Sequence, residues 1–255
     1  MFDKGYFQQR YETSVMGVDA DRRRAYLYRA RLRTLERMDI RPETVVELAC
    51  GAGSMTRWLA DAYDQVIATD LADAALQSCR ARMRDAGVAL VRTDAVKVGL
   101  RDGIADMVVA FDLLEHLPEP SRCLMEASRL LRPGGVLFLS TPNPASLGAR
   151  IKGRYPQYRG LPLAQRKKQW FGWQDDSHVS ILPIEIWREK LVESGFELVS
   201  DGTDYWWDAP YFSWLPAFPQ EAICKVLQRV FTRYRYFLPW AQGENYIAVA
   251  RKTVG

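Results

Sequence analysis

The chain has 255 residues, with 35 basic and 31 acidic side chains and a formal net charge of +4. This length suits one domain with additions, and the small net charge says little about nucleic acid. The four cysteines form no C-x-x-C pair, which indicates a reduced compartment and excludes a cysteine-based structural zinc site. No run approaches the ~20 apolar residues of a membrane span, and the first residues lack the apolar core of a signal peptide. We therefore expect a soluble, cytoplasmic protein.

The N-terminal segment is expected to precede the main domain. Residues 1–20 are polar with interspersed aromatics, and from about Asp21 to Met38 the pattern becomes helical, with many arginines on what we expect to be a solvated face. We predict an N-terminal helical lid or arm over residues 1–40.

The next stretch, residues 44–70, predicts strand, glycine turn, helix and strand. An apolar run at 45–48 is typical of a buried parallel strand, and a second run ends in Asp70. The turn between them is E-L-A-C-G-A-G, residues 47–53. Its glycines let the backbone pass close to a ligand, and an acid at the tip of the second strand can accept both hydroxyls of a ribose. The pattern lacks the third glycine of a dinucleotide site, so it predicts a nucleoside site of another kind.

Alternating strands and helices continue after this unit. Apolar runs at 88–91, 107–111 and 136–140 predict strands, and helical spacing covers 73–86 and 119–131. Such alternation predicts an α/β fold with a parallel, doubly wound sheet, whose ligands bind beyond the carboxyl ends of the strands.

Polar residues converge on that edge. Asp70, Asp94, Phe111 and the cluster at 112–116 all follow predicted strands. The convergence of four separate segments is a stronger signal than any one of them.

The C-terminal third begins with a long connection, 141–183, that contains five prolines. A helix is predicted at 184–194, and strands at 196–199 and 245–250 would form an antiparallel pair that completes the sheet. The residues between these strands, 205–243, form an insertion.

The insertion begins with a dense aromatic run: Tyr205, Trp206, Trp207, Tyr211, Phe212, Trp214 and Phe218. We expect these aromatics to line or cover an acceptor pocket. Apolar residues then recur with helical spacing over 223–231, with basic residues at other positions. Two interpretations stay open: a helix that caps the sheet, or an interfacial helix that gives peripheral membrane contact through 205–240.

Three motifs carry a family resemblance: E-L-A-C-G-A-G, F-D-L-L-E-H-L at 111–117 and L-L-R-P-G-G at 130–135. With them the chain resembles the class I S-adenosylmethionine-dependent methyltransferases over roughly 25–204 and 244–252, and most closely the ubiquinone-biosynthesis O-methyltransferase group. The resemblance implies a doubly wound, seven-stranded, mostly parallel, Rossmann-like sheet with an aromatic-rich insertion before the last strand. The cofactor-binding domain would comprise 41–204 and 244–255, with 205–243 as an acceptor cap.

Carried over position by position, the resemblance implies a set of S-adenosylmethionine contacts: Arg29, Glu47, Ala49, Cys50, Gly51, Gly53, Asp70, Leu71, Asp94, Ala95 and Phe111. Arg29 would hold the methionine carboxylate, or would be a solvated arginine. Asp70 would hold the ribose hydroxyls, or would cap a helix. Phe111 would pack against the adenosine or the methyl donor. Ala49 stands where the family pattern usually has its first glycine.

The chain's only two histidines, His116 and His178, both fall where the active site is expected. In one interpretation, Asp112, Glu115, His116 and His178 bind a divalent ion, Mg²⁺, Mn²⁺ or Fe²⁺. In a second, His178 or His116 is a general base and Glu115 orients the imidazole. In a third, Glu115 caps the next helix and His116 packs there.

These observations predict an S-adenosylmethionine-dependent methyltransferase that acts on a hydroxyl of a small hydrophobic or aromatic acceptor. A hydroxyl of a sugar, a glycolipid or a nucleic acid is the alternative acceptor, and a non-catalytic cofactor-binding module is the alternative class. The basic clusters at 22–24 and 166–168 are short, which argues against nucleic acid. The sequence indicates no oligomeric state.

Overall fold

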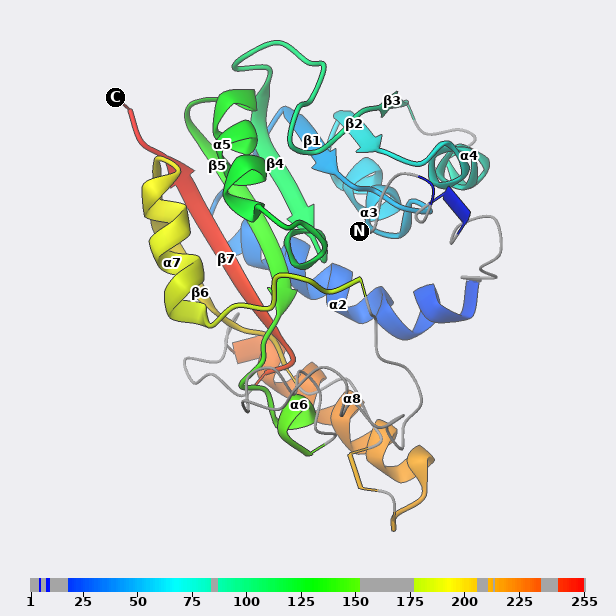
Figure 1. Cartoon of the computed structure of the whole chain (residues 1–255). Coiled ribbons are helices and arrows are strands. Elements are labelled where there is room, and N and C mark those ends of the chain that lie inside the picture. Colours follow the sequence, from blue (N-terminus) through cyan, green and yellow to red (C-terminus); the bar gives the residue numbers. More distant parts are fainter. Residues whose placement is uncertain are drawn as a thin grey trace.

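The computed structural model of the chain describes residues 5, 8, 9, 18–83, 87–151, 177–205, 211, 212, 214–234 and 243–254. A seven-stranded sheet with the order β3-β2-β1-β4-β5-β7-β6 forms its centre (Figure 1). The strands are β1 (Thr44–Leu48), β2 (Gln65–Asp70), β3 (Val88–Arg92), β4 (Ala105–Phe111), β5 (Leu131–Pro142), β6 (Phe196–Thr203) and β7 (Asn245–Lys252). The helices are α2 (Val18–Arg37), α3 (Ser54–Ala62), α4 (Asp73–Arg82), the 3-10 helix η1 (Leu114–His116), α5 (Pro120–Leu130), α6 (Leu147–Ile151), α7 (Ile184–Glu193) and α8 (Ala217–Tyr234).

The strand pairing confirms the predicted sheet. β1 pairs in parallel with β2 and β4, and the parallel order continues to β3 on one side and β5 on the other. β7 is antiparallel to both β5 and β6, as the C-terminal pattern predicts. The carboxyl ends of β1, β2 and β4 therefore meet at one edge.

Successive residues of the strands enter two different cores, as a pleated sheet requires. Val46 packs in the core that contains Leu124 of α5 and Trp187 of α7. Its neighbour Val45 packs in the core formed with α2 and α3. Helices thus cover both faces of the sheet, which explains why its central strands β1 and β4 are near-continuous apolar runs.

Three predicted boundaries are wrong by four or more residues. The strand predicted at 196–199 continues to Thr203 as β6. The helix predicted over 73–86 ends as α4 at Arg82, because Met83 leaves helical geometry and joins a small buried cluster with Cys79; residues 84–86 lie outside the described residues. β5 begins at Leu131, before the predicted start, and its pairing with β4 jumps from Leu131 to Val136. The predicted turn at 132–135 is therefore a bulge within the strand.

Candidate active site

The turn after β1 is held in left-handed backbone geometry at alternate residues. Ala49, Gly51 and Gly53 have φ angles of 55°, 54° and 80°. Ala49 pays a cost of about 1 kcal/mol that glycine would avoid. Gly53 has a second constraint, because a Cβ there would lie 2.7 Å from the Cys79 sulfur. The motif's glycines thus serve both the turn and its packing against α4.

Asp70 ties this turn to the tip of β2. Its Oδ2 accepts a hydrogen bond from the Gly51 N–H, and its Oδ1 accepts one from the Ala72 N–H, both at 2.9 Å. Burial raises the pKa of Asp70, and the backbone N–H bonds oppose that rise. Each carboxylate oxygen has two lone pairs, so this geometry is compatible both with the helix-capping role and with a ribose contact.

Glu47 lies beneath the turn. It is only 4% exposed, and the Thr56 hydroxyl donates to its Oε2 at 2.6 Å, which joins β1 to α3. Burial raises the pKa of Glu47 to about 8. Cys50, another buried side chain of the motif, lies beside Cys79. Glu47 and Cys50 therefore form part of the foundation of the turn.

The raised pKa of Glu47 predicts a pH dependence of stability. Between about pH 4.5 and 8 the folded chain binds a proton here that the unfolded chain does not, so the free energy of unfolding falls as pH rises, by up to about 1.4 kcal/mol per pH unit. Glu47→Gln should flatten this slope in urea unfolding measured across that window. The exposed Glu43→Gln is the control. Equal slopes for wild type and Glu47→Gln would contradict the assignment.

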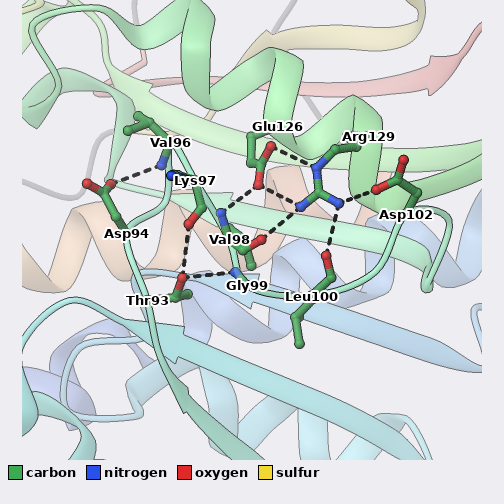
Figure 2. Close-up of polar contacts among 10 residues, drawn as sticks. All are labelled: Thr93, Asp94, Val96, Lys97, Val98, Gly99, Leu100, Asp102, Glu126 and Arg129. Atoms are coloured by element: carbon green, nitrogen blue, oxygen red, sulfur yellow. Dashed lines mark hydrogen bonds and ion pairs between the residues drawn. The ribbon is translucent and has the colours of Figure 1, made fainter.

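Arg129 of α5 fixes the loop that follows β3 (Figure 2). Its guanidinium donates to the carbonyl oxygens of Val98 and Leu100 at 2.8 and 2.9 Å, and it pairs with Glu126 and Asp102. Glu126 in turn accepts the Val98 N–H at 2.5 Å, and Arg129 lowers its pKa. The loop is therefore held by charge-assisted hydrogen bonds at two of its peptide carbonyls.

This loop carries the predicted contacts Asp94 and Ala95. Asp94 is exposed, and its Oδ1 accepts the Val96 N–H at 3.0 Å (Figure 2). Ala95 is half-buried against the core. Both lie just after β3, while Leu71 follows β2 and is half-buried. These three residues occupy the same edge as Asp70.

Arg31, which the sequence analysis did not select, is buried at the end of β4. It is 4% exposed, its Cζ lies 4.4 Å from the centroid of the Phe111 ring, and its Nη2 lies 3.9 Å from Asp112 Oδ1. Among the described residues, neither Nε nor Nη1 of Arg31 has a hydrogen-bond partner. Buried guanidinium donors are normally satisfied, so this side chain is suited to an anionic ligand.

The predicted Arg29 lies elsewhere. It is exposed on α2, with its Cζ 4.8 Å from the centroid of the Trp58 ring. Two residues along a helix are ~200° apart, so Arg29 and Arg31 point to different sides. Arg31 falls on the buried stripe with Tyr28 and Leu35, and that i, i+3, i+7 spacing is the signal that could have selected it.

The structure brings together three of the four predicted metal ligands. The ligand atoms of Glu115, His116 and His178 all lie within 4.8 Å of one another, and the two imidazole centroids are 4.8 Å apart. Glu115 is 1% exposed, and both histidines are half-buried. The N–H groups of Val179 and Ser180 donate to the Glu115 carbonyl at 2.8 and 2.9 Å, which docks the chain around His178 onto η1.

Asp112, the fourth predicted ligand, contacts other residues instead of this group. Its φ of 51° takes it out of η1, and its Oδ1 accepts the Ser140 hydroxyl at 2.9 Å and faces Arg31. The i, i+3 face with Glu115 would need a continuous helix, which η1 does not provide. The N-cap residue of helix α5 is Glu119, and its own side chain makes no capping hydrogen bond.

Two hydroxyl residues position the cluster. Ser177 is fully buried, with its Oγ 2.8 Å and its carbonyl oxygen 3.3 Å from His116 Nδ1. The Thr141 hydroxyl, from β5, donates to Glu115 Oε2 at 3.3 Å. These contacts fix the orientation of the His116 ring and the Glu115 carboxylate. No sequence pattern marks either residue, because both act through tertiary contacts.

Comparisons with known proteins identify the family to which this fold belongs. The family model described as "Methyltransferase domain" matches residues 46–139. The ubiquinone biosynthesis O-methyltransferase of Methylococcus capsulatus is 32% identical over 174 residues, which cover 63% of this chain and 73% of that protein. The enzyme of the same name from Xanthomonas oryzae pv. oryzae is 33% identical over 131 residues, 49% of this chain and 55% of the relative. The chain thus spans about half the length of several curated relatives it matches.

A solved structure shows the same fold. It is described as the complex between the Haloferax volcanii Trm112 methyltransferase activator and a putative methyltransferase, and it aligns with a TM-score of 0.64 and 18% identity over 97% of this chain and 98% of that chain. With the predicted seven-stranded sheet confirmed and the Methylococcus relative matched over most of its length, the chain belongs to the class I S-adenosylmethionine-dependent methyltransferase family.

Proposed function

We propose that the chain transfers the methyl group of S-adenosylmethionine to a hydroxyl of a small hydrophobic or aromatic acceptor. One observation carries this proposal: at the end of β4, residues suited to bind the cofactor lie next to residues suited to remove a proton from the acceptor. Phe111 lies under the buried Arg31, and within a few residues Glu115 and His116 meet His178. The O-methyl chemistry and the acceptor class follow the distant relatives, which are named as ubiquinone biosynthesis O-methyltransferases.

In this proposal the cofactor spans the edge from β2 to β4. The backbone of Ala49, Gly51 and Gly53 approaches it, and Asp70 accepts its ribose hydroxyls. Arg31 takes the role first assigned to Arg29 and pairs with the methionine carboxylate. Cys50, Leu71, Asp94 and Ala95 remain proposed contacts, and Glu47 supports the turn from below.

The reaction needs a nucleophilic oxygen. The oxygen–carbon bond forms as the carbon–sulfur bond of the sulfonium breaks, and the hydroxyl proton must pass to a base. A phenol with an ordinary pKa of about 10 is largely protonated at neutral pH. His178 and His116 are the two members of the cluster that can accept this proton, and Ser177 holds the His116 ring in place.

The same cluster fits a divalent ion. One carboxylate and two imidazoles form a donor set that suits Fe²⁺ or Mn²⁺ better than Mg²⁺, which prefers oxygen ligands. Glu115, His116 and His178 would hold it, while Asp112 of the original four-residue set has its contacts with Ser140 and Arg31. When bound, the ion supplies a positive charge that lowers the pKa of the acceptor hydroxyl.

We propose that residues 205–243 form an insertion that covers the acceptor, beside an arm at 1–40 and a cofactor-binding domain at 41–204 and 244–255. Tyr205 and Tyr211 are buried, which supports a role inside the molecule, whereas Trp214 and Phe218 are exposed. The predicted aromatics at 206 and 207 lie outside the described residues.

Asp70→Asn should weaken S-adenosylhomocysteine binding by about 10- to 100-fold, because a charged acceptor of two ribose hydroxyls is replaced by a neutral amide. Titration calorimetry measures this. Asp64→Asn, exposed next to the amino end of β2, is the matched control and should leave affinity unchanged. Equal affinity in wild type and Asp70→Asn would remove Asp70 from the cofactor site.

The function itself is tested by methyl transfer from labelled S-adenosylmethionine to catechols, simple phenols, sugars and RNA. Transfer to catechols or phenols supports the proposal, and transfer to sugars or RNA alone overturns the acceptor class. Cofactor binding without transfer to any acceptor in this panel would favour a non-catalytic module. No cofactor binding at all would overturn the proposal entirely.

A further inference from the structure

The surface of α8 is unusually apolar. Among the described residues, the exposed large hydrophobic side chains gather on one segment: Phe212, Trp214, Leu215, Phe218, Ile223, Val226 and Val230. Trp214 and Phe218 are 76% and 81% exposed. The others of this kind are scattered singly over the rest of the described chain. Single exposed apolar residues are ordinary, but a contiguous group marks an interaction surface.

The helix presents its apolar face outward. Ile223, Val226 and Val230 are spaced for one helical face and are exposed, whereas Gln220 and Cys224 on the other side are buried. A globular protein normally buries the apolar face, so this orientation is the reverse of a helix that caps a sheet.

Polar contacts hold this orientation. The Gln220 Nε2 donates to the carbonyl oxygens of Phe212 and Leu215 at 2.7 and 2.9 Å, and its Oε1 accepts the N–H groups of Tyr211 and Phe212 at 2.8 and 2.9 Å. The segment that carries Trp214 is therefore anchored to the buried side of α8. These hydrogen bonds hold the segment in the position that leaves its aromatic side chains exposed.

The net positive charge of this region indicates an anionic partner. Between residues 211 and 234 the sequence has three basic residues, Lys225, Arg229 and Arg233, and one acid, Glu221. Lys225 is exposed beside Val226. Bulky aromatics, an outward apolar face and excess positive charge are together typical of a helix that lies in the headgroup region of an anionic bilayer.

We propose that α8 and the segment before it dock the protein on an anionic lipid surface; we call residues 211–234 the docking segment. α8 runs along the lower end of the molecule (Figure 1), and none of the described helices is long and apolar enough to cross a membrane, so the segment would lie on the bilayer. The proposal does not depend on the methyl-transfer function, and either can fail without the other.

Co-sedimentation with vesicles tests it. We expect the full chain to bind vesicles of phosphatidylcholine with phosphatidylglycerol about tenfold or more tightly than vesicles of phosphatidylcholine alone, with binding weakened by salt. Phe218→Glu and Val226→Glu should each reduce binding about tenfold or more, because each replaces inserted apolar area with a charge. Lys225→Gln should reduce it about fivefold.

Val192→Glu is the matched control, since Val192 is 64% exposed on α7, outside the docking segment, and it should bind as wild type does. Circular dichroism melting checks that each variant folds. No sedimentation of wild type with either vesicle at low salt overturns the proposal. Self-association through this face also overturns it: wild type would then be a dimer that does not bind vesicles, and Phe218→Glu would be a monomer.

Discussion

Arg31→Ala is expected to weaken S-adenosylhomocysteine binding by roughly 30- to 1,000-fold, equivalent to about 2–4 kcal/mol. The buried guanidinium stacks on Phe111 and approaches Asp112 only to 3.9 Å, so its charge is incompletely paired without a ligand. Two of its nitrogens lack hydrogen-bond partners among the described residues. A carboxylate that satisfies them would form a strong, charge-assisted contact.

A ligand lacking the amino-acid group separates a direct contact from general damage. 5′-Methylthioadenosine retains the nucleoside but has no carboxylate, so wild type should prefer S-adenosylhomocysteine and Arg31→Ala should lose that preference. Arg31→Lys keeps the charge without the planar fork and should fall between the two. Equal losses for both ligands would show that Arg31 supports the site without touching the carboxylate.

The matched control is on the same helix. Arg29→Ala removes an equal charge two residues away, from an exposed side chain stacked on Trp58. We expect its affinity to stay close to that of wild type. If Arg29→Ala loses affinity and Arg31→Ala does not, Arg29 holds the methionine carboxylate and Arg31 does not.

The contrast between these arginines shows what sequence patterns can and cannot supply. The helix was predicted from its apolar spacing, but the family resemblance pointed to Arg29, and a shift of two residues along a helix changes the face on which a side chain lies. Burial of Tyr28, Arg31 and Leu35 settles the face. The centre of the sheet, by contrast, was predictable, because β1, β4 and the second half of β5 are apolar runs buried on both faces, and the glycine motif directly follows β1.

Long-range contacts account for the rest. His178 lies 62 residues after His116, and the backbone bonds from Val179 and Ser180 to Glu115 bring them together. Both histidines could be selected as candidate site residues from the sequence because the chain has no others. Ser177 could not be selected, because no sequence pattern marks it. The left-handed φ of Asp112, which separates it from Glu115, follows from its position between β4 and η1 and has no pattern of its own.

His178→Ala and His116→Ala are each expected to lower the rate of methyl transfer by about 10²- to 10⁴-fold while leaving S-adenosylhomocysteine affinity close to wild type. The imidazoles meet Glu115 on the acceptor side of Phe111 in the proposed arrangement, so their loss should affect proton removal and spare cofactor binding. Transfer to a catechol and titration calorimetry measure the two quantities. A parallel loss of both would show that the histidines support the fold of the cofactor site.

Manganese titration, followed by electron paramagnetic resonance, distinguishes the two roles of the cluster without any acceptor. If the cluster holds an ion, Glu115→Gln, His116→Ala and His178→Ala should each weaken Mn²⁺ binding about tenfold or more, while Asp112→Asn, whose carboxylate contacts Ser140 and Arg31, should weaken it far less. If wild type binds no Mn²⁺ and EDTA leaves methyl transfer unchanged, the histidines act as bases.

Ser177→Ala then tests the base mechanism. The substitution releases the His116 ring, so the pH profile of the methyl-transfer rate should change. Ser177→Thr retains the hydroxyl and should restore the wild-type profile.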